Sequence, residues 1–448
     1  MGRCRFTLIC VLLGALLLPA AADAARRPSI QKTLDSLAAQ GAITPEQRTT
    51  YTRDYSRARS AIRHLRGSAR SNLQGVIDNI AYLAGQNMLG ARVVPVFLTL
   101  ERNYEWFWTD REGPAAYGAR RTFDGTRLIF EFYPGSGWQI TALGNFGKLN
   151  GLAAAKRTKL SVLTNYGNEL LPLAVDRGGF LAFEYYFPWS GGKPGWISGM
   201  ATATGMAAFA RVWQRTGDQR FRDAGQRMLG AFGVAPPTGV LLDEGSGRAH
   251  YLQYSQDPDL LVGNAFAQSI IGLDDFATIT GDPNAAAARD RALADAAEEM
   301  PFYDTGAWSL YWHRPGSKVG GESDLHYHQV FEGFLEKLCA RFPSGPFCAL
   351  HDNFVRYESE PVKITRLSAR KQKKTLRIRY TVSKRGSGTL TLSKGGKAVA
   401  SSRFTFTSGG DHLLTWTAPK KRGAYELSFD TVSLNGVKNS AVKTLNLR

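Results

Sequence analysis

The spacing of apolar residues divides the chain into four stretches with different expected structures. Residues 29–89 repeat apolar positions with the period of an amphipathic helix, which predicts a helical N-terminal arm. Residues 93–133 instead alternate apolar and polar positions on either side of Gly113-Pro114 and Gly125, which predicts a small antiparallel sheet. From residue 141 to about 358 the helical period returns, interrupted by Gly and Pro breaks.

The third stretch predicts long helices that alternate with loops, roughly in pairs. Such pairs favour helical hairpins arranged around a common axis, an α/α toroid whose loops at one end line a groove for a polymer. The expected helices span residues 143–175, 196–216, 219–232, 262–280, 284–299 and 324–341.

The last stretch consists of short alternating segments with turn signals about every ten residues, which is typical of an immunoglobulin-like β-sandwich. The predicted fold class is therefore multidomain α+β. Its predicted parts are a leader (1–24), a helical arm (25–90), a small antiparallel β region (91–140), a toroid-like catalytic domain (141–358) and a basic sandwich (361–448).

The N-terminus has the pattern of an export signal. Arg3 and Arg5 precede an apolar segment at residues 6–19, and Ala22-Asp23-Ala24 fits an A-x-A cleavage site. A secreted or cell-envelope protein is expected, with an uncleaved anchor as the alternative; no later segment has about twenty apolar residues. In an oxidising compartment, Cys339 and Cys348 are expected to form a disulfide.

Charge is concentrated in the sandwich. The whole chain carries a formal charge of +18, and residues 361–448 contain 19 Lys and Arg against three acidic residues. These side chains either face solvent or attract an anionic polysaccharide or envelope; no nucleic-acid motif is present, so nucleic acid is not expected.

Four segments of the helical region gather polar and aromatic residues that helix packing does not require. They are residues 193–200, 251–264, 300–316 and 324–328. They contain the patterns PGWISGMA, LQYS, PFYDTG, LYWHR and DLHYH. At these places, over roughly residues 180–340, the chain resembles the C-terminal domain of the D-glucuronyl C5-epimerases, enzymes that invert uronic acids within heparan-type polymers.

The resemblance implies that Tyr254, Tyr311 and Tyr327 perform the proton transfers and that Arg314 binds the substrate. One departure is Gln253, which replaces an acid of the family pattern and puts full activity, or the same substrate, in doubt. The resemblance further implies a uronic-acid polysaccharide as partner and a tendency to dimerise.

These residue types suit the chemistry. Inverting C5 of a uronate removes a proton next to a carboxylate and returns one from the opposite face, which requires one group on each face and a cation on the carboxylate. A tyrosine titrates near pH 10, so a tyrosine base needs nearby positive charge, which Arg314 is expected to provide. The same arginine would bind the carboxylate through its bidentate fork.

Other residues of the four segments are assigned to substrate contact: Gln253, Trp196, His326 and His328, with Asn264 either bonding substrate or capping a helix. The two histidines have metal-like spacing but lack a third ligand nearby, so neither a metal nor a cofactor is expected. Three functions stay open: a uronyl C5-epimerase, a lyase that expels the C4 substituent after the same proton abstraction, and a non-catalytic polysaccharide-binding protein.

Overall fold

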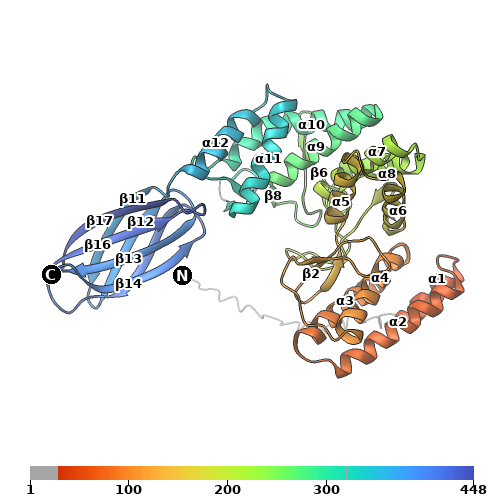
Figure 1. The fold of residues 1–448 in the computed structure, drawn as a ribbon, viewed down its shortest axis with the longest axis horizontal. Coiled ribbons are helices and arrows are strands. Elements are labelled where there is room, and N and C mark those ends of the chain that lie inside the picture. The colour runs from red at the N-terminus through yellow and green to blue at the C-terminus, as the bar shows by residue number, and fades with distance from the viewer. Residues whose placement is uncertain (1–28, 318–319, 448) are drawn as a thin grey trace, which may run out of the picture.

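The computed structural model describes residues 29–317 and 320–447. The predicted export signal at residues 1–24 lies outside them. The molecule is elongated, with a β-sandwich at one end, helices in the middle and the first four helices at the other end (Figure 1). The chain is thus a multidomain α+β protein, as its sequence predicted. No helix within the described ranges is long and apolar enough to cross a membrane.

The predicted helical arm is present as three helices. These are α1 (Ile30–Ala39), α2 (Pro45–His64) and α3 (Gly67–Gly85), followed by the short turn η1 (Gly90–Arg92). A capping box at Thr44 and Gln47 begins α2, because each side chain bonds the other residue's backbone N–H. The arm packs its apolar stripe into the main core.

The structure corrects the prediction for the first half of the small sheet. Residues 93–109 form α4 (Val93–Tyr104) and the π-turn η2 (Glu105–Thr109) in place of a strand. Val93, Val96, Phe97 and Leu100 are all nearly fully buried, and their spacing is that of one helix face. β-branched and aromatic residues favour strands only weakly, so burial of this face decides the structure.

The second half forms an antiparallel sheet, as expected. Its strands are β1 (Arg120–Arg121), β2 (Phe130–Tyr133) and β3 (Gly137–Ile140), in the order β1-β2-β3. Asn103 of α4 joins the sheet to the arm, because its side chain bonds both the N–H and the carbonyl of Trp138.

Helices make up most of the next region. They are α5 (Ala142–Ala154), α6 (Leu160–Leu170), α7 (Gly199–Thr216), α8 (Gln219–Met228), α9 (Gly263–Thr280), α10 (Pro283–Glu299), α11 (Leu325–Arg341) and α12 (Phe347–Ser359), with turns η3 (Leu171–Leu173), η4 (Leu229–Gly233) and η5 (Met300–Tyr303). The predicted helix at 143–175 is therefore two helices and a turn. Helix α7 packs against both α5 and α9.

Short strands that the helical pattern did not predict lie between these helices. They are β4 (Val175–Asp176), β5 (Leu181–Ala182), β6 (Leu241–Gly245), β7 (Arg248–Tyr251), β8 (Leu261–Val262), β9 (Leu310–His313) and β10 (Gly320–Glu322). The last three form one antiparallel sheet, with β9 in the middle.

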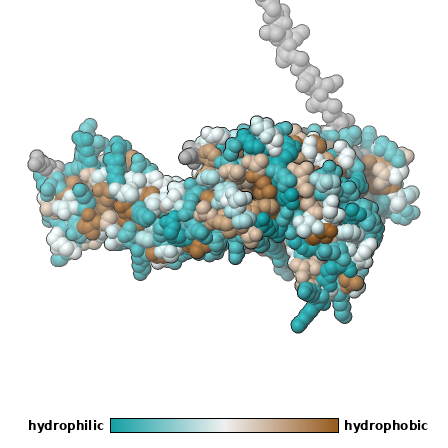
Figure 2. Space-filling view, turned by 90° about the horizontal axis from the view of Figure 1, so that it is seen from above, coloured by the Kyte–Doolittle hydropathy of each residue, from teal (hydrophilic) through white to brown (hydrophobic). Residues whose placement is uncertain are grey.

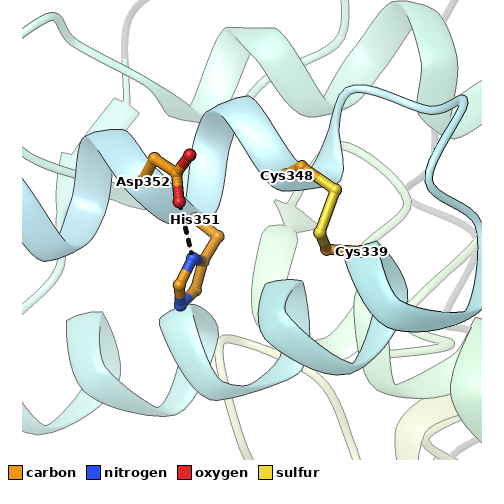
Figure 3. Close-up of a disulfide and its surroundings, with 4 residues drawn as sticks. All are labelled: Cys339, Cys348, His351 and Asp352. Carbon is orange, nitrogen blue, oxygen red and sulfur yellow. Dashed lines mark hydrogen bonds and ion pairs between the residues drawn. A yellow bond between two sulfur atoms is a disulfide. The ribbon is translucent and has the colours of Figure 1, made fainter.

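The predicted disulfide between Cys339 and Cys348 is present and joins the end of α11 to the start of α12 (Figure 3). It closes the turn between two antiparallel helices. The His351–Asp352 pair lies one turn further along α12.

Seven antiparallel strands form the C-terminal sandwich. They are β11 (Ile364–Gln372), β12 (Thr375–Val382), β13 (Gly386–Lys394), β14 (Lys397–Phe406), β15 (Gly410–Thr417), β16 (Gly423–Val432) and β17 (Lys438–Leu447). The sheets β11-β12-β15 and β14-β13-β16-β17 share a core separate from the helical one. Isolated hydrophobic patches interrupt the hydrophilic surface in the view of Figure 2.

Two residues attach the sandwich to the helical region. Lys384 is buried and donates to the carbonyls of Tyr357 and Glu360, at 2.5 and 2.7 Å. Glu322, at the end of β10, accepts hydrogen bonds from the backbone N–H groups of Arg385 and Gly409. These contacts connect the sandwich directly to the sheet that contains β9.

Candidate active site

A cavity of about 240 Å³ lies between the small β1-β2-β3 sheet and the helical region. Its volume is below the roughly 300–1,000 Å³ of pockets that hold drug-sized ligands. Aromatic side chains dominate its lining, which includes Tyr117, Tyr133, Tyr185, Phe187, Trp189, Trp196, Tyr254, Tyr311 and Tyr327. The polar residues Arg120, Glu131, Gln253, Asn264 and His326 also line it.

Tyr254 is positioned by the segment that begins α7. The N–H of Ser255 donates to the carbonyl of Ile197, and the N–H of Ile197 donates to the Ser255 hydroxyl, each at 3.0 Å. The N–H of Gly199 donates to the carbonyl of Leu252. A Cβ on Gly199 would lie 2.7 Å from that carbonyl oxygen, so glycine permits the close approach.

Tyr311 lies on the central strand β9. Trp312 and His313, the next two residues, pair with Val262 and Leu261 of β8 on one side and with β10 on the other. Because both neighbouring strands fix the register of β9, the Tyr311 ring has a defined position at the cavity.

Tyr327 lies in the first turn of α11. The carboxylate of Asp324 caps this helix by accepting the N–H of Tyr327 at 2.8 Å. The side chain is more open than those of the other two tyrosines, with 40% of the residue exposed.

The three predicted tyrosines converge. The hydroxyl oxygens of Tyr254 and Tyr311 are 3.5 Å apart, and the rings of Tyr311 and Tyr327 are 4.6 Å apart between centroids. Burial raises the pKa of the Tyr311 phenol well above its ordinary value, and the neighbouring Tyr254 adds to the rise. Burial is also the main cause that raises the pKa of Tyr327. Tyr311 and Tyr327 are therefore neutral proton donors in the free protein.

Three further predicted residues line the same cavity. Trp196 lies edge-on to Tyr254, and Gln253 accepts a hydrogen bond from the hydroxyl of Ser198 at 3.0 Å. Asn264 is only 4% exposed, and its Oδ1 has no hydrogen-bond partner. Residue Val262 begins α9 without a side-chain cap, so of the two predicted roles for Asn264 the structure favours ligand contact over capping.

The two predicted histidines lie in different places. His326 lines the cavity and is exposed. His328 is fully buried, stacks on Trp308, and uses its ring nitrogens on the Ser309 hydroxyl and the Phe354 carbonyl. Two positions along a helix turn a side chain through about 200°, so the two rings face opposite ways. The predicted substrate contact of His328 is therefore corrected to a packing role.

The position of Arg314 also requires a correction. It follows β9, its side chain is 57% exposed, and its closest acidic group is Asp259 at 4.0 Å. It is not among the described residues that line the cavity. Strand β9 ends at His313, so the chain turns away before Arg314, and sequence proximity to Tyr311 does not bring the guanidinium to the tyrosines.

The cationic side chain found at the cavity is that of Arg120, where the sequence analysis expected Arg314. Arg120 is the only Lys or Arg among the described residues that line the cavity, and it bonds Glu131 across the β1–β2 pair at 2.7 Å. Tyr133 also donates to Glu131, at 2.8 Å. The sequence signal for these residues was the alternation along β2, which puts Glu131 and Tyr133 on one face of the sheet. That alternation did not indicate which part of the protein would pack against this face.

The described residues form a protein of mixed α and β structure with a cavity lined by tyrosines. Residues 178–352 match the family described as D-glucuronyl C5-epimerase C-terminus, which confirms the resemblance over this segment. Tyr254, Tyr311 and Tyr327 all lie within the matched segment.

Curated relatives match shorter parts of the chain. The D-glucuronyl C5-epimerase of Caenorhabditis elegans is 27% identical over 130 residues, covering 26% of this chain and 21% of the relative. An uncharacterized protein of Methanocaldococcus jannaschii is 23% identical over 152 residues, covering 33% of this chain and 48% of the relative. The chain thus spans between about a fifth and a half of these relatives.

Among solved structures, the cellobiose 2-epimerase of Bacillus thermoamylovorans B4167 is similar with a TM-score of 0.39 and 10% sequence identity. The match covers 67% of this chain and 76% of that structure. This TM-score is too low to support a conclusion about function.

Proposed function

We propose that the protein is a carbohydrate epimerase, and that it inverts C5 of D-glucuronyl residues within an anionic polysaccharide. The observation that supports this most directly is the convergence of Tyr254, Tyr311 and Tyr327 in one cavity, inside the segment that matches the epimerase family. The toroid-like arrangement of the helices is part of the same proposal.

Arg120 is proposed to bind the substrate carboxylate. Removing the C5 proton moves negative charge onto that carboxylate as the enolate forms, so a guanidinium there stabilises the transition state more than the ground state. The existing bond from Arg120 to Glu131 holds the guanidinium at the cavity before substrate arrives.

Tyr254 and Tyr311 are proposed to act as one proton-transfer pair on a single face of the sugar. Their hydroxyls are 3.5 Å apart, which leaves no room for a sugar ring between them. In this pair the Tyr254 phenolate takes up the C5 proton and becomes a neutral phenol. Before that step, the neutral Tyr311 donates the hydrogen bond that stabilises the phenolate. Tyr327 extends the pair toward the cavity mouth.

The opposite face is assigned to Tyr117, which lies on the sheet side of the cavity. Its ring stacks on Trp189 and packs edge-on to Tyr133. Tyr117 is 62% exposed, and its partial burial is the main cause that raises the pKa of its phenol, so Tyr117 is a neutral acid that can deliver the new proton to C5.

One experiment separates the three functional classes. The protein is incubated in deuterated water with heparan-type polysaccharide and, as a second uronate polymer, hyaluronan. Deuterium at C5 with an unchanged chain length is the expected result. A new ultraviolet-absorbing double bond with chain shortening would show a lyase, and retention of polymer without either change would show a binding protein.

Replacing Arg120 with glutamine is expected to lower C5 exchange by about a hundredfold to a thousandfold, as for loss of one oxyanion donor. Arg314→Gln is the matched control, because Arg314 is exposed and outside the cavity. Exchange is measured for both by mass spectrometry. A larger loss in Arg314→Gln than in Arg120→Gln would reject the assignment of the cation.

Replacing Tyr117 with phenylalanine is expected to separate exchange from inversion. The Tyr254–Tyr311 pair would still remove and return a proton on its own face, so deuterium enters while glucuronate is retained. Proton NMR of the polymer measures the ratio of the two C5 configurations alongside deuterium content. Normal inversion in this variant would exclude Tyr117 as the opposite acid.

The basic sandwich is proposed to hold the same polysaccharide, since residues 361–448 carry the excess positive charge. Export from the cytoplasm, through the signal expected at residues 1–24, is proposed with it. Both proposals fit a polymer that lies outside the cell, and neither involves nucleic acid.

A further inference from the structure

A second polar cluster contains none of the described residues that line the cavity of Tyr254, Tyr311 and Tyr327. It consists of His250 on β7, Asp295 and Glu299 on α10, and His313 on β9. His250, Asp295 and His313 are 0%, 4% and 3% exposed, and the Glu299 side chain is 11% exposed. Two imidazoles and two carboxylates are thus collected from three separate elements in the core.

The ligand atoms of this cluster are close together. One atom each from His250, Asp295 and Glu299 lie within 4.8 Å of one another. Nδ1 of His250 is 2.7 Å from Glu299 Oε2, and Nε2 of His313 is 3.3 Å from Glu299 Oε1. Glu299 is therefore the centre of the group.

The protein alone does not satisfy this cluster. Oδ2 of Asp295 and Nε2 of His250 are buried without a hydrogen-bond partner. Asp295 and Glu299 also lie one helical turn apart on the same face of α10, so two carboxylates share a space from which water is largely excluded. Such an arrangement needs protons or a cation to balance its charge.

Surrounding groups orient the cluster in the way that metal ligands are usually oriented. Nδ1 of His313 lies 2.9 Å from the carbonyl oxygen of Arg314, which leaves Nε2 directed toward Glu299. The hydroxyl of Tyr303 donates to Glu299 Oε1 at 2.5 Å. Hydrogen bonds of this kind fix the tautomer of a histidine and the direction in which a side chain points its ligand atom at a metal.

We propose that His250, Asp295, Glu299 and His313 form a binding site for a divalent transition metal, with Zn²⁺ the best fit. Two imidazoles and two carboxylates match the nitrogen and oxygen ligands that Zn²⁺ takes in a four-coordinate site. The sequence did not indicate it, because the ligands are separated by up to 63 residues and no two have the spacing of a known metal motif.

A second group of potential ligands provides a contrast. His328 lies near Glu332 and Glu358, but both of its ring nitrogens already have partners in Ser309 and Phe354. The proposed site, in contrast, retains unpartnered atoms. A neighbouring cavity of about 190 Å³, lined by Asp295, Glu299 and His313, gives an ion a path to the cluster.

The metal would join β7, α10 and β9. Since β9 also carries Tyr311, the ion is assigned a structural role that holds this strand in place. The site is argued from the cluster alone and does not depend on the proposed epimerase activity, so its test measures metal content and stability.

The full chain, prepared without a polyhistidine tag, is stripped with a chelator, exposed to zinc sulfate and freed of unbound ion. Elemental mass spectrometry is expected to find about one zinc per chain, and the melting temperature is expected to rise by several degrees on zinc addition. Asp295→Asn keeps the side-chain shape and is expected to lose the bound zinc and the rise. His351→Gln, at a half-buried histidine of α12 outside the cluster, is the control and should keep both.

A spectroscopic measurement on the unaltered chain covers the case in which Asp295→Asn fails to fold. Cobalt(II) bound to nitrogen and oxygen ligands in tetrahedral geometry gives visible absorption bands. Added zinc should displace the cobalt and remove these bands. Failure of the unaltered chain to retain zinc or to show these bands would overturn the proposal and identify the cluster as one balanced by protons. Equal zinc retention by folded Asp295→Asn would overturn it as well.

Discussion

Tyr311→Phe is expected to remove C5 exchange almost completely while leaving the fold intact. The substitution deletes one oxygen, so the ring still packs against Tyr327, but the hydroxyl that contacts Tyr254 is gone. Without that donor the phenolate on Tyr254 loses its stabilising hydrogen bond, and a positioned acid–base group typically contributes about a hundredfold to ten-thousandfold. Deuterium incorporation into the polymer measures the loss, and circular dichroism monitors the fold.

Tyr82→Phe is the matched control, because it makes the same chemical change on α3, away from the cavity. It should keep normal exchange. Near-normal exchange in Tyr311→Phe would reject the role of Tyr311. Loss of exchange in both variants would indicate a general effect of removing phenols rather than a specific one.

Glu184→Gln is expected to lower the free energy of unfolding by about 3–5 kcal/mol, as when one partner of a buried ion pair is removed. Glu184 has a fully buried side chain and binds two arginines, Arg92 at 2.6 Å and Arg177 at 2.8 Å. These arginines are only 12% and 14% exposed, so the neutral amide leaves two poorly solvated charges without their counter-charge. The cluster also joins the N-terminal arm to the helical region.

Chemical denaturation followed by tryptophan fluorescence measures this change. Trp416 is the only tryptophan of residues 361–448, so the signal reports mainly the larger core. Glu336→Gln on the exposed face of α11 is the control and should change stability little, as is usual for exposed charges. A shift in Glu184→Gln no larger than in the control would show that the two arginines are stabilised without it.

Local patterns predicted the elements where one physical signal dominates. The arm helices, the helices at 262–280 and 324–341 and the C-terminal strands follow from periodicity. Two nearby cysteines, together with the expectation of export, predicted the disulfide. The pattern failed at residues 93–109, where β-branched and aromatic residues alternate but one helix face is buried. Propensity was outweighed there by packing against the arm and β3.

For the candidate site, too, the sequence predicted some residues correctly and misplaced others. The resemblance to the epimerases led to Tyr254, Tyr311 and Tyr327, and the structure brings them together with Trp196, Gln253, Asn264 and His326. The resemblance also led to Arg314, and His328 was assigned from the polar segment that contains Tyr327, yet the end of β9 and the turn of α11 direct both side chains elsewhere.

By itself the sequence determined most of the longer helices and strands, the order of the parts, the disulfide and the resemblance of residues 178–352 to an epimerase family. Only the tertiary structure decided that Arg120 and Glu131 meet the tyrosines from a separate sheet, and that His250, Asp295, Glu299 and His313 form one buried cluster. The reason is that periodicity and short motifs record how a segment relates to its own neighbours in the chain. A site depends on which distant segments share a surface, and that is fixed by the packing of the whole core.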